Sequence, residues 1–172
     1  MKEQNKVRVG WELPTELKVF REENGEQPLI IGKEYTLSMN EKANLRKALA
    51  SWRGKDFSED EAKKFDITVL IGKPCMLNII HKPGTKDPSQ IYEEIGSISP
   101  MPKGFTCPDQ INNTQLLTYE EWDETIYEAL PDFIKDKIKK SNEYKQFMHP
   151  ETTTLPDGKG LNDETETDDL PF

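Results

Sequence analysis

Apolar side chains occupy every second position from Val7 to Leu13. A period of two predicts a half-buried β-strand. A second strand is expected over Leu29–Met39, because this segment is rich in β-branched and aromatic residues, and Gly32 within it suggests a bulge. Residues 23–26, around an Asn-Gly pair, indicate the turn between them.

The apolar spacing changes to three and four residues after Asn40. This spacing predicts a helix from about Glu41 to Trp52, with Asn40 as its N-cap and Gly54 at its end. Ser58 and Glu61 have the spacing of a capping box, which predicts a short second helix.

A hairpin is expected over residues 73–99. Residues 73–82 have the composition of a strand, residues 83–88 contain the turn residues Pro, Gly and Asp, and residues 91–99 form the returning strand. Alternation places Cys75, Leu77 and Ile79 on the inner face.

The rest of the chain is predicted to be a linker, two helices and a tail. Residues 100–117 contain three prolines and a glycine, as a linker does. Thr118 with Glu121 predicts a helix that continues to Leu130, and Pro131 introduces another over residues 132–140. Residues 150–172 have little apolar material to pack and are expected to be disordered.

These elements predict a mainly β protein with helices, of the α+β class. The order strand, strand, helix, strand, strand fits a small barrel of the oligonucleotide/oligosaccharide-binding (OB) type with an inserted helix, one strand short at its front. The expected organisation is an OB-like core over residues 1–117, a helical segment over residues 118–149 and an acidic tail over residues 150–172.

Composition limits the function classes. Two cysteines, Cys75 and Cys107, make neither a disulfide framework nor a zinc motif, and two histidines are too few for a histidine-rich metal site. The polar N-terminus does not have the pattern of a signal peptide, and no apolar run reaches membrane-spanning length. A reducing, cytoplasmic setting without cofactor, metal or membrane is therefore expected.

The acidic residues are concentrated towards the C-terminus. The chain has a net charge of −9, but residues 1–90 hold 16 Lys and Arg against 14 Asp and Glu, whereas residues 151–172 hold seven acidic residues and one lysine. Screening over about 8 Å weakens long-range repulsion in physiological salt. The net charge therefore does not exclude binding of nucleic acid at a local basic face.

The chain ends on the partner-docking candidates Asp168, Asp169, Leu170, Pro171 and Phe172. This ending closely resembles the C-terminal tip of bacterial single-stranded DNA-binding proteins, Asp-Asp-Ile-Pro-Phe, with one conservative change. The resemblance implies that the tip recruits replication, recombination and repair enzymes. The alternative is a tail that only adds solubility.

Residues 34–54 and 72–82 resemble a phage-encoded family of small single-stranded DNA-binding proteins. The resemblance continues through Ile95–Pro100 and into Leu130–Ile138. It implies an OB fold, coating of single-stranded DNA during replication and recombination, and a place in the cytoplasm of a bacterial host. Members of the family carry further residues before the position of Lys2, so the first barrel strand is expected to be missing or replaced here. The sequence leaves open whether the chain forms homo-oligomers.

Binding of single strands without sequence readout requires cations for phosphates and flat rings for bases. The candidates are Arg8 and Lys33 on the first strands, Trp52, Arg53 and Lys55 at the helix end, and Lys73, Lys82, Lys86 and Tyr92 on the hairpin. Trp52 also completes the apolar stripe of its helix, which favours core packing. Trp11 and Tyr35 share the parity of core positions.

Catalysis is not indicated. There is no nucleophile with a base, no phosphate-binding glycine loop and no metal cluster in the pattern, so a hydrolase is disfavoured. A protein-binding adaptor is the competing hypothesis: it would use the tip to occupy host replication and repair factors without binding DNA.

Overall fold

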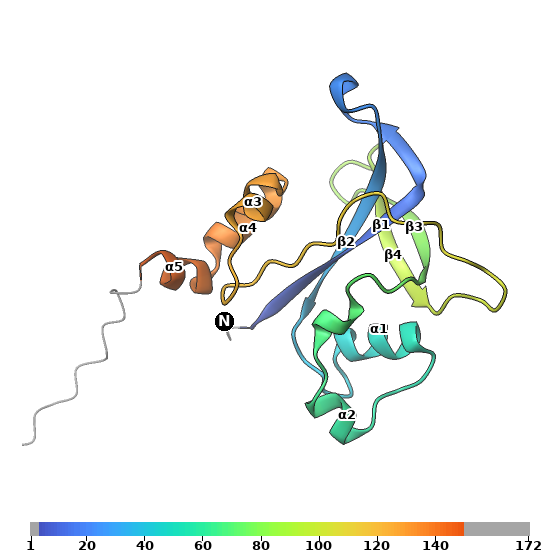
Figure 1. Ribbon diagram of the computed structural model, residues 1–172, viewed down its shortest axis with the longest axis vertical. Coiled ribbons are helices and arrows are strands. Elements are labelled where there is room, and N and C mark those ends of the chain that lie inside the picture. Colours follow the sequence, from blue (N-terminus) through green and yellow to red (C-terminus); the bar gives the residue numbers. More distant parts are fainter. Residues whose placement is uncertain (1–3, 150–172) are drawn as a thin grey trace, which may run out of the picture. The chain divides into compact units, whose positions relative to one another are not determined.

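The computed structural model describes residues 4–149, which divide into two compact units between Gln115 and Leu116. The first unit carries the strands and the first helices of the described chain (Figure 1). Its elements, in chain order, are β1 (Lys6–Val19), the 3₁₀ helix η1 (Glu22–Asn24), β2 (Glu26–Thr36), α1 (Asn44–Arg53), α2 (Glu59–Lys63), the 3₁₀ helix η2 (Ile67–Leu70), β3 (Met76–Pro83) and β4 (Ile91–Ser99). The second unit contains α3 (Glu124–Ala129), α4 (Asp132–Lys140) and α5 (Asn142–Met148).

β1 and β2 form an antiparallel pair in which Trp11 lies opposite Ile31. Gly32 pairs regularly with Gly10, so the expected bulge at Gly32 is wrong. The glycine instead makes room for an arginine, because a Cβ at this position would lie 2.6 Å from Nη2 of Arg8. The register shifts farther along, between Leu13 and Leu17, a stretch that includes a proline without an amide donor.

β3 and β4 form the predicted hairpin, with a bulge in β4. Asn78 lies opposite Ser97, whereas Ile79 lies opposite Ile95, which leaves Gly96 as the extra residue. The bulge places Ile95 and Ile98 on the same face although three positions separate them. Both side chains are therefore buried in the core.

α1 contacts both sheets, through β2 and β4. Its inner face contributes Leu45, Leu49 and Trp52 to one core cluster, together with Trp11, Tyr35, Phe57, Ala62, Ile95 and Ile98. The core positions expected for Trp11 and Tyr35 are thus confirmed, at 8% and 6% exposure.

The helix begins later than predicted. Asn40 does not cap it; its side chain accepts a hydrogen bond from the Lys42 amide at 3.1 Å, which forms a separate turn, and Ala43 is the N-cap. Gly54 ends the helix as predicted, in the left-handed conformation with φ of 75°.

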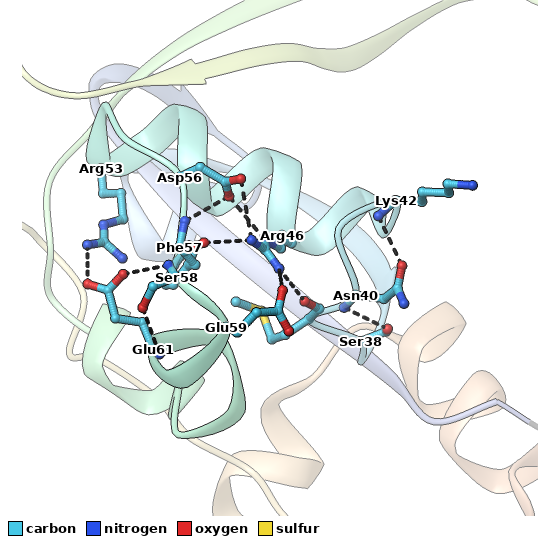
Figure 2. Close-up of polar contacts among 11 residues, drawn as sticks. Ser38, Asn40, Lys42, Arg46, Arg53, Asp56, Phe57, Ser58, Glu59 and Glu61 are labelled. Atoms are coloured by element: carbon cyan, nitrogen blue, oxygen red, sulfur yellow. Dashed lines mark hydrogen bonds and ion pairs between the residues drawn. The ribbon is translucent and has the colours of Figure 1, made fainter.

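Arg46 on α1 fixes the segments on either side of the helix (Figure 2). Arg46 is 4% exposed. Its guanidinium donates to Asp56 Oδ1 at 3.1 Å, to the carbonyl of Phe57 at 2.6 Å and to the carbonyl of Met39 at 3.3 Å. Glu59 lies 3.6 Å away as a second counter-charge. The hydrogen bond from Arg46 is the main cause that lowers the pKa of Asp56.

The two sheets remain separate within residues 4–149. Each has two strands, and they do not close into a barrel, although β2 and β4 approach each other. The α+β class expected from the sequence is confirmed, with two small antiparallel sheets and five α-helices in the described chain.

The second unit packs around aromatic rings. Trp122 lies within 4.9–5.9 Å, centroid to centroid, of the rings of Tyr119, Tyr127, Tyr144 and Phe147. Thr118 accepts a hydrogen bond from the Glu121 amide at 2.9 Å, as predicted, but it forms a turn; the helix starts at Glu124 because Asp123 caps it. α4 has the predicted bounds, α5 was not predicted, and the expectation for residues 150–172 lies outside the described residues.

Candidate nucleic-acid interface

A polar groove of about 830 Å³ lies in the first unit among β2, α1 and β4. Residues 33–36 of β2 form one side and residues 95–98 of β4 form the other. The remaining lining comes from Lys6, from Ser38, Asn40, Lys42 and Ala43 before α1, and from Asn44, Lys47, Ala48 and Ser51 on the helix.

The groove face of α1 follows from its sequence. The lining positions 44, 47, 48 and 51 have the spacing of a single helical face, and the core positions 45, 49 and 52 lie on another. Burial of the apolar face in the core therefore turns Lys47 and its polar neighbours towards the groove.

Lysines dominate the charge of the groove. Lys6, Lys33, Lys42 and Lys47 line it, against one carboxylate, Glu34. That carboxylate lies 3.5 Å from the Arg8 guanidinium, which compensates its charge. A concave surface with an excess of ammonium groups attracts anions. Of these four lysines, only Lys33 was predicted as a binding residue. Lys47 could have been found from its position on the face of α1 that lies away from the apolar stripe.

Two side chains of the groove are anchored on the free edge of β4. Lys33 Nζ donates to the carbonyl of Ile95 at 2.9 Å, and Ser51 Oγ donates to the carbonyl of Ile98. Lys33 Nζ also lies 6.0 Å from the centroid of the Tyr35 ring. Lys6, Lys42 and Lys47, by contrast, are exposed.

The hairpin places Lys82 and Tyr92 opposite each other. The Tyr92 ring is 55% exposed and rests against Gly84, where a Cβ would lie 2.8 Å from ring atom Cε2. Its hydroxyl donates to the Gln90 side chain at 2.6 Å, so the ring is held in place. Lys82 forms an ion pair with Glu94 at 2.6 Å, which offsets part of its charge. Lys86 is exposed in the turn.

The helix-end candidates do not line the groove. Trp52 is 8% exposed, its Nε1 donates to the Pro74 carbonyl at 3.1 Å, and its ring lies 6.0 Å from that of Trp11. The ring is thus part of the core and offers no face to a base. Arg53 is exposed, but its guanidinium lies 4.4 Å from the centroid of the Phe57 ring and binds Glu61 at 2.8 Å; Lys55 is exposed as well.

The remaining candidates lie elsewhere. Arg8 is not among the residues that line the groove; it lies opposite Glu34 in the β1–β2 pair, with its guanidinium beside Gly32, and Lys73 is exposed between η2 and β3. The structure thus brings Lys33 together with three lysines that were not predicted. The tip residues, Asp168–Phe172, lie outside the described residues.

Metal binding and membrane insertion were also considered for the described residues. Between residues 4 and 149, no group of three or more His, Cys, Asp or Glu side chains is placed to hold a metal ion. In the same range, no helix has both the length and the apolar character needed to cross a bilayer.

In comparisons with family models, curated proteins and solved structures, none matched this chain. The interpretation of the groove therefore depends on its geometry and charge.

Proposed function

We propose that this protein binds single-stranded DNA without catalysis, as a phage-type coating protein of replication and recombination. One observation carries the proposal: four lysines and one compensated carboxylate line a groove in a chain whose net charge is −9. A local excess of cations within an acidic protein supports binding of an anion in the groove.

A nucleic-acid strand fits this groove better than a compact anion does. The lysines come from three places, the start of β1, the middle of β2 and the region around the start of α1, so they are distributed along the groove. Distributed ammonium groups suit a chain of phosphates, and release of its counterions favours binding.

We propose that the first unit is an open, OB-like barrel. The order of its elements and the approach of β2 to β4 support this description. The exposed Tyr92 ring, with Lys82 and Lys86 near it, would add one stacking contact at the hairpin.

The proposed recruiting element is the tip, Asp168–Phe172, with replication and recombination proteins as its partners. Its support is the sequence: two carboxylates, an aliphatic residue, a proline and a terminal ring suit a basic, apolar pocket. Removal of these five residues should abolish partner capture and leave the DNA affinity unchanged or higher.

The test is a titration of fluorescein-labelled oligo(dT) with micromolar protein at low salt, followed by fluorescence anisotropy. Wild-type protein should bind, and the double charge reversal Lys42→Glu/Lys47→Glu should weaken binding more than tenfold. Lys63→Glu/Lys64→Glu is the matched control, because it makes the same charge change on exposed residues outside the groove. Equal loss in both variants, or no salt-sensitive binding by the wild type, would contradict the proposal.

The adaptor role is the second candidate. It is favoured by the burial of Tyr35, the aromatic residue of the groove, because single-strand binders usually present accessible rings. An adaptor would capture partners through its tip and show no DNA binding with or without these five residues.

A further inference from the structure

The chemistry of the groove lining restricts which part of a DNA strand it contacts, and this inference rests on the proposed function. We propose that the groove holds the sugar–phosphate chain and leaves the bases outside, so that base identity and even base presence have little effect on its affinity.

The rings in and near the groove offer no stacking face. Tyr35 is the aromatic residue among the lining residues; it is 6% exposed, and the Lys33 ammonium lies over its ring. Trp11 and Trp52 are both 8% exposed within the core. A base that entered the groove would therefore meet no accessible ring among the lining residues.

Three polar side chains of the groove are already engaged in hydrogen bonds within the protein. Lys33 and Ser51 donate to carbonyls of β4, and the Asn40 side chain accepts from the Lys42 amide. Base-edge readout needs donors and acceptors held in a fixed position and open to the base. Each of these three side chains already uses a donor or an acceptor in a bond within the protein, which reduces its capacity to bind a base edge.

The exposed groups are suited to phosphate. Lys6, Lys42 and Lys47 are the exposed lysines of the lining, and an ammonium on a long stem can follow a phosphate without defining a base. Phosphate contacts position a strand and carry no sequence information by themselves. Binding in the groove should therefore depend on the number of phosphates and on salt.

The decisive experiment compares oligo(dT) with an oligomer of abasic sites of equal length and equal phosphate number. Both are titrated against the full chain carrying Tyr92→Ala, so that the exposed hairpin ring makes no contribution. The two dissociation constants should agree within fivefold, and Lys42→Glu/Lys47→Glu should weaken both to the same degree.

Each result has one meaning. A preference for oligo(dT) of more than fivefold in the Tyr92→Ala protein would overturn the inference while the proposed function stands. Binding of neither oligomer by wild-type protein would contradict the proposed function itself. Thermal melting by circular dichroism, with Lys63→Glu/Lys64→Glu as the matched variant, separates loss of contacts from loss of the fold.

Discussion

At the scale of single residues, the lysines of the groove have two different roles. Lys33 bonds to the Ile95 carbonyl across the gap between β2 and β4, so it supports the arrangement of the two sheets as well as adding charge. Lys42 and Lys47 are exposed and contribute charge to the surface of the groove. Substitution of these two lysines should therefore affect ligand binding more than stability.

The salt dependence of DNA binding should report these lysines one at a time. Lys42→Gln and Lys47→Gln should each reduce the slope of log K against log salt by about 0.7, the value for loss of one phosphate contact on a single strand. Lys64→Gln, outside the groove, should leave the slope unchanged. Anisotropy titrations over a series of salt concentrations measure the slopes; equal slopes in all four proteins would rule out phosphate contacts by these lysines.

Trp52 should be important for stability and not for DNA binding. Trp52→Phe removes the donor to the Pro74 carbonyl and part of the ring in contact with Trp11. We expect the free energy of unfolding to fall by about 1–3 kcal/mol. Urea denaturation measures this loss, and oligo(dT) affinity of the folded variant should stay within twofold of wild type. A large loss of affinity with normal stability would instead show that the ring contacts DNA.

At the scale of elements, the sequence pattern predicted whether a segment is a strand or a helix better than it predicted where that element begins and ends. The strand pairs and the apolar face of α1 follow from local periodicity, so they were predictable. The start of α1 was not predictable in this way, because the Asn40 side chain accepts a hydrogen bond from the Lys42 amide in a separate turn and does not cap the helix. The groove also required tertiary information: Lys6, Lys33 and Lys47 come together only when β1, β2, α1 and β4 pack.

The junction of α1 and α2 should make stability depend on acid. Arg53, together with the Ser58 amide, lowers the pKa of Glu61 to about 2 from an ordinary value of 4.5. A carboxyl group with a lowered pKa in the folded state stabilises the fold above its unfolded pKa, and this contribution is lost as the pH falls from 4.5 towards 2.

Glu61→Gln tests this dependence. The variant should melt at a lower temperature than wild type at pH 7, because its amide cannot form the ion pair with Arg53. The difference should shrink between pH 4.5 and 2, when wild-type Glu61 becomes protonated. Glu59→Gln, whose carboxylate lies near Arg46, is a control at the same helix. A difference in melting temperature that is constant from pH 7 to pH 2 would contradict the assignment.

At the scale of the whole molecule, the uneven distribution of charge should affect how fast DNA binds. Residues 151–172 hold seven acidic residues and one lysine, whereas the groove has an excess of lysine. Acidic residues on the same chain repel a DNA strand, and they also compete with it for a basic surface. Both effects are electrostatic, so both weaken as the screening length falls from about 30 Å at 0.01 M salt to about 8 Å at 0.15 M.

Two variants separate charge from length in the C-terminal segment. One lacks residues 151–172, and the other keeps them with the four acidic residues from Asp157 to Glu166 changed to their amides, which leaves the tip intact. At 0.01 M salt, both should associate with oligo(dT) faster than wild type in stopped-flow anisotropy, and at 0.15 M the difference should be much smaller. If only the shortened protein were faster, the four neutralised carboxylates would not be responsible, and the effect would belong to chain length or to the three acidic residues that the second variant keeps. If neither were faster, the acidic segment would have no influence on the groove.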